Sequence, residues 1–274
     1  MARIVSSLDL LLRLKVLGYD NPSRDPWWWP ESGTFLTAVS AILTQNVAWS
    51  NVERSLDRLR QAGVTSPHAL AQCAPEDLEV LIRPSGFYRN KARNLIALAH
   101  HLLSDFGSFE AFAANVSRDW LLARRGIGPE SADAILNYAC YREAFVVDSY
   151  TARLLDALGI ELHGYDAVQQ WCLAGIVGRE AELFPKAHNT TSSSRPAASR
   201  TTTIALADPT QMSHDSLEHK HGVETKSSLS GSGLPGSMPA AQVYARAHGM
   251  IVEYAKANRS GRSIDVAELL SAAQ

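Results

Sequence analysis

The chain has 274 residues, a formal net charge of −2 at pH 7, 46% hydrophobic residues and 20% charged residues. A chain of this length can bury one sizeable core or two small ones. The near-neutral charge excludes a uniformly basic protein, so any contact with a polyanion has to come from a local basic surface. The apolar runs are short, and Arg13 and Lys15 interrupt the N-terminal one, which disfavours a membrane span or a secretory signal. We therefore expect a cytoplasmic protein.

The N-terminal part predicts one helix followed by an extended segment. Ser6 and Ser7 can cap a leucine-rich helix that stops at Gly18. A proline-rich stretch, 21–30, then contains Trp27, Trp28 and Trp29. Three consecutive side chains cannot share one face of a regular element, so we expect at least one ring to point away from the others. These tryptophans could equally be anchors in the core or rings that line a ligand pocket.

Two helices with a polar junction follow. Apolar residues recur every three to four positions from Phe35 to Leu43, and a second helix is predicted from Trp49 to Gln61. Gln45 lies in the loop between them, where it can either cap a helix end or face a ligand. Trp49 begins the second helix and can belong to the core or to a pocket. Shorter helices are predicted after Ser66 and Ala74, because a proline follows each of them.

A basic segment precedes the next long helix. It contains Arg83, Arg89, Lys91 and Arg93, with no acidic residue as far as Ser104. We expect a helix that runs to Leu103 and carries these cations on its first turn. Arg89 and Lys91 are our candidates for phosphate contacts, since a few cations on one face are sufficient to grip a phosphate backbone. Further helices are predicted at 109–114 and 117–123.

The stretch from Leu121 to Asp148 contains the strongest local signal. Two helical runs flank Gly126, Ile127 and Gly128, and two glycines allow a sharp turn that exposes backbone N–H groups. These donors coincide with the N-terminus of the second helix, so the turn suits a phosphate. An ordinary turn between two packed helices is the alternative. Asp148 ends the apolar segment that follows and can act as a plain helix cap or as an ionised site carboxylate, since a helix N-terminus lowers its pKa.

The C-terminal third changes in composition. Residues 188–238 are rich in Ser, Thr, Gly and Pro without an apolar period, which predicts a disordered linker. Its His214, His219 and His221 lack accompanying cysteines or paired carboxylates, so we do not expect a metal site. A helix is predicted at 240–258, folded back on the N-terminal helices, and 259–274 forms a tail with a short helix. The only cysteines, Cys73, Cys140 and Cys172, are expected to be buried thiols.

These motifs together resemble the helix-hairpin-helix DNA glycosylases of the endonuclease III superfamily. The matching features are the Gly-Ile-Gly hairpin with its Ala-rich helix, Val-Val-Asp-Ser ending at Ser149, Gly-Phe-Tyr-x-x-Lys-Ala from Gly86, and Leu-Thr-Gln-Asn from Leu43. The resemblance implies that Asp148 is catalytic, that the hairpin binds DNA, and that Gln45 fills the gap left by an extruded nucleotide. Many members carry an iron–sulfur cluster on four C-terminal cysteines. No cysteine follows Cys172, so we expect no cluster and no other cofactor.

One departure from the family's pattern concerns the chemistry. Bifunctional members have a lysine at the position of Glu130, and a carboxylate cannot form their Schiff base. The resemblance therefore implies a monofunctional enzyme that uses water. Glu130 is then either a supporting group near the site or a solvated acid at a helix start, and we favour the second. Within the superfamily the chain looks most like the 3-methyladenine DNA glycosylases, which implies an alkylated purine held between Trp49 and either Trp28 or Trp29.

The sequence thus predicts an all-α protein of two helical lobes with a cleft between them. The glycosylase domain comprises 1–187 with 239–258, its central lobe covers about 33–140, and the N- and C-terminal helices form the second lobe. Its expected partner is double-stranded DNA with a damaged base, bound by a monomer, on the nucleoid if the source is bacterial. Two alternatives remain: a lyase for oxidised pyrimidines with a nucleophile such as Lys91, and a non-catalytic DNA-binding protein.

Overall fold

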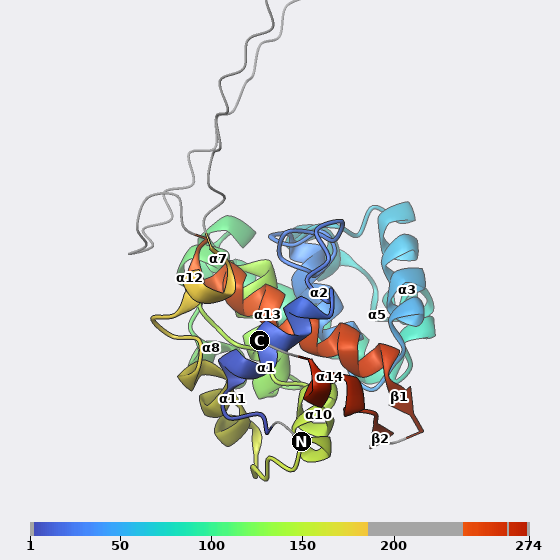
Figure 1. Ribbon diagram of the computed structural model, residues 1–274. Helices are drawn as coiled ribbons and strands as arrows, with labels where there is room; N and C mark the ends of the chain where they lie inside the picture. The colour runs from blue at the N-terminus through green and yellow to red at the C-terminus, as the bar shows by residue number, and fades with distance from the viewer. Residues whose placement is uncertain (1–2, 186–237, 262, 273–274) are drawn as a thin grey trace, which may run out of the picture. The chain divides into compact units, whose positions relative to one another are not determined.

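The computed structural model describes residues 3–185, 238–261 and 263–272. Together these residues belong to one compact unit that brings the two sides of the predicted linker together (Figure 1). The linker itself, 188–238, lies outside the described residues except for Met238, as do His214, His219 and His221. None of the described helices is long and apolar enough to cross a membrane.

The described part of the chain is mostly helical, as predicted. In chain order the elements are α1 (Ser7–Val16), α2 (Phe35–Leu43), α3 (Trp49–Gln61), α4 (Pro67–Gln72), α5 (Pro75–Leu81), η1 (Arg83–Ser85), α6 (Tyr88–Phe106), α7 (Phe109–Asn115), α8 (Arg118–Leu122), α9 (Pro129–Ala134), η2 (Ile135–Ala139), α10 (Ser149–Ala157), α11 (Tyr165–Ala174), α12 (Glu180–Leu183), α13 (Ala240–Ala257), β1 (Arg259–Ser260), β2 (Ser263–Ile264) and α14 (Ala267–Ser271).

The expectation that no strand would form is wrong in one detail. β1 and β2 pair antiparallel, with Arg259 opposite Ile264 and Ser260 opposite Ser263. Gly261 lies between them with a positive φ of 62°, which a glycine adopts without steric cost. The sequence of this tail contains no alternating apolar pattern, and so a hairpin of two-residue strands could not be recognised from it.

Helix starts follow from the capping residues in the sequence. The side chains of Ser6, Thr34, Ser66, Ser108 and Ser117 each accept a hydrogen bond from a backbone N–H in the first turn of the helix that follows. Each such cap satisfies one of the free donors at a helix start and stabilises the helix by about 1 kcal/mol.

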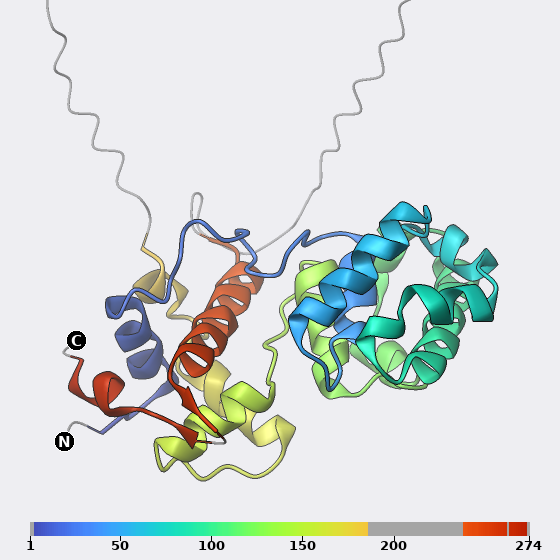
Figure 2. The ribbon, with the colours of Figure 1, turned by 90° about the vertical axis from the view of Figure 1, so that its right-hand side faces the viewer.

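The helices pack into two groups, each around its own core (Figure 2). α2 to α9 and η2 surround the first core, whose fully buried side chains include Leu59, Leu70 and Phe112. α1 and α10 to α14 surround the second, which includes Leu11 and Tyr254. α13 packs on α1 and α10, so the C-terminal helix folds back on the N-terminal one, as expected. It also contacts η2 of the first group.

The segment that leads to Asp148 runs along the boundary of the two cores. Phe145 and Val147 are buried in the second core, whereas Val146 between them is buried in the first. Extended backbone directs successive side chains to opposite sides, so one short segment is anchored in both groups of helices. The position of Asp148 is therefore fixed by two cores at once.

A buried polar cluster ties the two groups together nearby. The carboxylate of Asp133, in α9, is 1% exposed and accepts hydrogen bonds from Arg118, Tyr165 and Gln169. Gln169 also donates to the carbonyl of Phe145, and the Tyr165 hydroxyl accepts the N–H of Val147. Because a buried carboxylate with all these partners is costly to disturb, α9, α11 and the segment before Asp148 are held in one geometry.

Candidate active site

Asp148 caps α10, and its two carboxylate oxygens have different surroundings. Oδ1 accepts hydrogen bonds from the backbone N–H of Tyr150 at 3.0 Å, the N–H of Thr151 at 2.9 Å and the Thr151 hydroxyl at 3.1 Å. Oδ2 takes no part in the cap and lies 3.7 Å from Nε2 of His248. Burial raises the pKa of Asp148, but the neighbouring His248 and the hydrogen bonds from Thr151 lower this pKa by more, so it lies below its ordinary value. The carboxylate is ionised at neutral pH.

His248 and Tyr138 lie behind this carboxylate, and sequence reasoning missed both. His248 lies on α13 and is 2% exposed, and its Nδ1 lies 2.6 Å from the hydroxyl of the fully buried Tyr138. Nε2 has no hydrogen-bond partner and faces Asp148. Burial and the neighbouring Asp148 raise the pKa of Tyr138 well above its ordinary value, so it remains a neutral phenol. In the sequence His248 shows only as one position on an apolar helix, which carries no functional signal.

The glycine hairpin has the geometry that its sequence predicts. Gly126 has a φ of 81°, and a side chain there would also collide with Asn94, so only glycine fits. Ile127 is buried and anchors the turn in the first core. Gly128 caps α9, and neither glycine N–H has a hydrogen-bond acceptor among the described residues. These free donors at a helix start are suited to a phosphate oxygen.

Gln45 is tied to this hairpin. Its Nε2 donates to the carbonyl of Gly126 at 3.0 Å and to the hydroxyl of Ser131 at 2.8 Å. The loop that carries it therefore belongs to the same surface as the hairpin. A role for Gln45 in filling a gap in a duplex requires these two bonds to be exchanged for contacts with DNA. The neighbouring Asn46 is exposed and has a φ of 56°.

The tryptophans form a connected cluster, in which Trp29 occupies the centre. Trp29 is 7% exposed, and its Nε1 donates to the Ser40 hydroxyl at 2.8 Å. Its ring meets Trp28 at 6.1 Å and 78°, and Trp49 at 5.4 Å and 87°. Trp28 and Trp49 are only partly buried. Trp29 thus belongs to the core, with two more accessible rings standing nearly perpendicular to it.

Trp28 packs against α13 as well as against Trp29, whereas the ring of Trp27 packs on Tyr141 with centroids 4.2 Å apart. Trp28 adopts a φ of 66°, which few non-glycine residues do, and packs edge-on against His248 with ring centroids 5.4 Å apart. Its Nε1 donates to Glu253 on α13. The ammonium of Lys256 lies 5.8 Å from the Trp28 ring and 5.6 Å from the ring of Tyr150, two residues after Asp148.

Glu130 lies in the electrostatic environment of Asp148. The residue is exposed by surface area, yet desolvation and then the negative charge of Asp148 raise the pKa of its carboxyl, while His248 lowers it. The charge of one carboxylate acts on another over several ångströms, so the two groups influence each other although part of Glu130 is in solvent. Glu130 therefore combines both positions considered for it: the start of a helix and the vicinity of the site.

The side chain of Lys91 is buried, whereas the sequence predicts a position on the surface. It is 4% exposed, and its ammonium donates to the backbone carbonyls of Leu43, Gln45 and Ser85 at 2.7–2.9 Å. Burial lowers the pKa of Lys91 to about 8. All three donors are engaged, at the end of α2, in the Gln45 loop and in η1, so the side chain joins these segments and has no donor left for a phosphate. The basic run did not reveal this, because sequence alone does not show where free carbonyls at a helix end will lie.

The start of α6 is an exposed surface with basic and aromatic side chains. Arg89 is exposed, with a 3.7 Å ion pair to Glu79, and its guanidinium lies over the ring of Tyr88. Phe87 is 70% exposed and has a φ of 45°. A large apolar side chain that is exposed on strained backbone costs free energy, which makes Phe87 a candidate for a contact. The run of cations in the sequence did not indicate Phe87.

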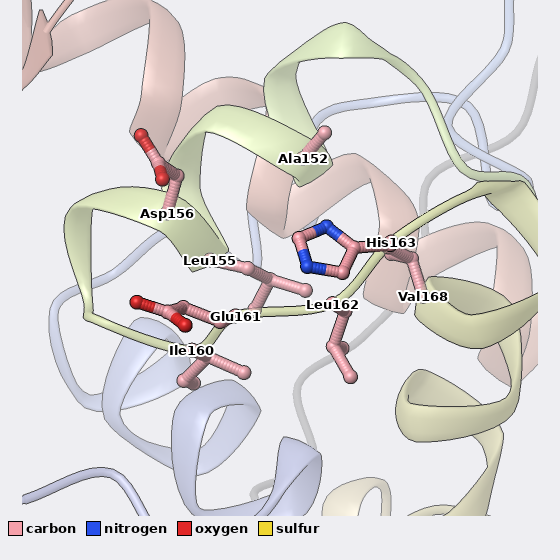
Figure 3. A pocket seen from close by; sticks show the side chains of 8 residues that line it. All are labelled: Ala152, Leu155, Asp156, Ile160, Glu161, Leu162, His163 and Val168. Carbon is pink, nitrogen blue, oxygen red and sulfur yellow. The ribbon is translucent and has the colours of Figure 1, made fainter.

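One hollow of the structure lies apart from this site. The pocket in Figure 3 is lined by α10, the segment after it and α11, and it includes none of the residues described above. Its Asp156, Glu161 and His163 do not form a metal site, because no group of three suitable ligands occurs among the described residues. Cys140 and Cys172 are buried free thiols, and Cys73 is half-buried. Burial raises the pKa of Cys140 and of Cys172 to about 12.

A helical body in which a glycine hairpin and an ionised aspartate lie near a tryptophan cluster is the architecture of a helix-hairpin-helix repair glycosylase. The chain belongs to the HhH-GPD superfamily of base excision DNA repair proteins, whose family model matches residues 39–171. A protein of Methanocaldococcus jannaschii whose name assigns it to the DNA repair glycosylases is 37% identical over 168 residues, which are 59% of this chain and 76% of the relative. Endonuclease III of Thermotoga maritima is 30% identical over 47% of this chain and 58% of its own length.

Solved structures show the same fold. The crystal structure of the H. pylori 3-methyladenine DNA glycosylase bound to 1,N6-ethenoadenine is similar over 93% of this chain and all of that chain, with a TM-score of 0.71 and 32% sequence identity. A trapped covalent endonuclease III–DNA intermediate matches with a TM-score of 0.51 and 21% identity, which shows a shared fold. The resemblance read from the sequence is therefore confirmed at the level of the superfamily.

Proposed function

We propose that the protein is a monofunctional DNA glycosylase that releases alkylated purines, with Asp148 as the catalytic carboxylate. The observation that carries this proposal is the state of Asp148: it is ionised, its Oδ1 is held by the start of α10, and its Oδ2 lies outside the cap. Cleavage of an N-glycosidic bond passes through an oxocarbenium-like transition state. A fixed negative charge near the sugar stabilises that cation and orients an attacking water.

The tryptophan cluster supports an alkylated purine as the base. Trp28 and Trp49 stand nearly perpendicular to Trp29, so an extruded base can stack on either ring with Trp29 beneath. Purines alkylated at N3 or N7 carry a positive charge, which aromatic faces attract. They are also good leaving groups, so no strong general acid is needed. The relative solved with ethenoadenine is named a 3-methyladenine DNA glycosylase, which agrees with this class of base.

The proposed DNA surface combines three neighbouring segments. They are the hairpin at Gly126, the Gln45 loop that is bonded to it, and the start of α6 with Phe87 and Arg89. The buried Lys91 connects the Gln45 loop with the residues before α6, because its ammonium donates to the carbonyls of Gln45 and Ser85. Free N–H donors and cations hold the phosphates, whereas Phe87 and Gln45 are the residues we propose to enter the base stack of a bound duplex. We further propose that a monomer binds the DNA.

The placement of the lysines supports hydrolysis without strand cleavage. Glu130 stands where bifunctional members have lysine, and Lys91 is engaged with three carbonyls. Lys256 is the lysine that lies over Trp28 and Tyr150, so it is the residue to examine if a Schiff base does form. Borohydride trapping on lesion-containing duplex tests this directly: we expect no covalent adduct, and an adduct abolished by Lys256→Arg would establish the lyase alternative.

The proposal is tested by base release from methylated duplex DNA, with the product identified by mass. Asp148→Asn should abolish release but keep DNA binding, because asparagine still caps α10 and only the negative charge is lost. Asp156→Asn is the matched control, since Asp156 is an exposed carboxylate on the same helix. Undiminished release by Asp148→Asn would remove Asp148 from the mechanism. Duplex binding by the wild type without release of any base would favour the non-catalytic alternative.

A further inference from the structure

We propose that His248, oriented by Tyr138, is a positioning residue that presents an Nε2–H to the free oxygen of Asp148. This inference rests on the proposed function of Asp148 and extends it to two residues that no sequence motif identifies. His248 lies between Tyr138 on η2 and Asp148 at the start of α10 and is itself on α13. The catalytic carboxylate is thereby linked to three elements of the fold.

The two neighbours of His248 select one tautomer of its ring. A carboxylate only accepts hydrogen bonds, so a ring nitrogen 3.7 Å from Oδ2 interacts favourably when it carries a proton. Nδ1 of a neutral ring is then an acceptor, and the Tyr138 hydroxyl at 2.6 Å is its donor. Tyr138 can donate because it remains a neutral phenol. Both neighbours therefore favour the tautomer protonated at Nε2.

The bond from His248 would restrain the one oxygen that the helix cap leaves free. Oδ1 already accepts three hydrogen bonds, which fix the Asp148 side chain at one end. Nε2 of His248 is buried, without a hydrogen-bond partner, and aimed at Oδ2. A modest approach of the two groups completes the bond, as often happens when substrate binds. Asp148 would then be held at both oxygens, with a remaining lone pair of Oδ2 for water or the sugar.

Charge gives the arrangement a further consequence. Neutral His248 leaves Asp148 with its full negative charge, whereas an imidazolium would cancel that charge and repel a cationic purine. The groups that face His248 from the surrounding elements are Tyr138, Asp148 and Glu130, while Trp28 and Phe145 contribute uncharged rings. An uncharged ring in this place is therefore the form that suits excision of a cationic base.

A matched pair of variants separates positioning from packing. In His248→Gln the amide nitrogen can occupy the place of Nε2 and donate to Asp148, whereas in His248→Asn the shorter amide reaches only the place of Nδ1, facing Tyr138. Rates are measured under single-turnover conditions at neutral pH on N7-methylguanine in duplex DNA, with melting temperatures as a check on folding. We expect Gln to keep most of the rate. We expect Asn to lose roughly 10- to 100-fold, as is usual for outer partners of a site.

Equal losses in the two variants would overturn the inference, since packing alone would then explain His248. A second measurement does not depend on activity: ¹⁵N NMR of labelled histidine, assigned with His248→Gln, should show the Nε2-protonated tautomer, with Tyr138→Phe shifting it. An Nδ1-protonated ring would also overturn the inference. If wild-type protein shows the expected tautomer but releases no alkylated purine, the proposed function fails and the His248 geometry stands by itself.

Discussion

The indole of Trp28 lies directly against the backbone of Gly249, in the middle of α13. A Cβ at Gly249 would collide with the inner atoms of the ring, which cannot move aside as the tip of a flexible side chain does. The glycine therefore allows the Trp28 ring to lie beside His248, the preceding residue on the helix. A substitution at Gly249 can therefore displace the Trp28 ring while the tryptophan itself is kept.

We predict that Gly249→Ala slows excision of alkylated purines. Alanine is better than glycine within a helix by about 1 kcal/mol, so the change would stabilise α13 if the ring did not intervene. We expect a lower melting temperature and a lower single-turnover rate, because the ring has to leave its place. The double variant Trp28→Ala/Gly249→Ala should lose no more activity than Trp28→Ala alone. Additive losses would show that Gly249 acts on something other than Trp28.

We predict that Lys91→Met destabilises the protein and does not alter borohydride trapping. Methionine resembles the stem of lysine but leaves the carbonyls of Leu43, Gln45 and Ser85 without their donor. A buried polar group without a partner costs about 1–3 kcal/mol. Arg93→Met is the control, since Arg93 is exposed on the same helix and its loss should shift the melting temperature little. An unchanged melting temperature together with loss of a trapped adduct would make Lys91 the nucleophile after all.

Local signals sufficed for the helices and for the hairpin. Serine or threonine before an apolar run, as at Ser6 and Ser108, marks a helix start because the cap is made within a few residues. Gly126 was recognisable for a similar reason, since its positive φ is a property of the local chain. Asp148 followed from the family's Val-Val-Asp-Ser motif, and the structure adds which oxygen is held.

The partners of Asp148 could not be read in the same way. Tyr138 and His248 are 110 residues apart and meet only because α13 packs on η2 after the predicted linker. Lys91 appeared as one cation in a basic run, although packing brings its ammonium to the carbonyls of Leu43 and Gln45, which are 48 and 46 residues away. Trp29 could not be distinguished from Trp28 until Ser40 supplied a partner for its ring nitrogen. Such roles depend on packing between distant segments, which no local pattern encodes.

We predict that Phe87→Ala weakens excision by weakening the grip on distorted DNA, and leaves folding unchanged. The ring is 70% exposed, so its removal costs the folded protein little. If Phe87 enters the base stack, the variant should bind lesion duplex more weakly, with a matching fall in rate at low enzyme concentration. Val177→Ala is the control, since Val177 is 58% exposed and does not belong to the proposed DNA surface. Equal behaviour of the two variants would remove Phe87 from the DNA contact.

We predict that the accessible rings of Trp28 and Trp49 favour charged lesions, whereas Trp29 maintains the fold. A cation above an aromatic face gains roughly 0.5–2 kcal/mol over its neutral parent, which gives modest discrimination. The weak glycosidic bond of an alkylated nucleotide supplies the rest. Trp28→Ala and Trp49→Ala should therefore slow excision of 3-methyladenine more than that of hypoxanthine, if hypoxanthine is processed.

Trp29→Ala should behave differently, because its ring is buried and its Nε1 is bonded to Ser40. Loss of a buried aromatic ring typically costs about 3–5 kcal/mol, so the variant should melt at a much lower temperature and lose activity on both substrates alike. Trp29→Phe keeps most of the ring and serves as the milder control. The deciding quantity is the ratio of the two excision rates in each variant, measured well below its melting temperature. If that ratio is the same in all three alanine variants, the rings only pack, and selection of the damaged base resides elsewhere.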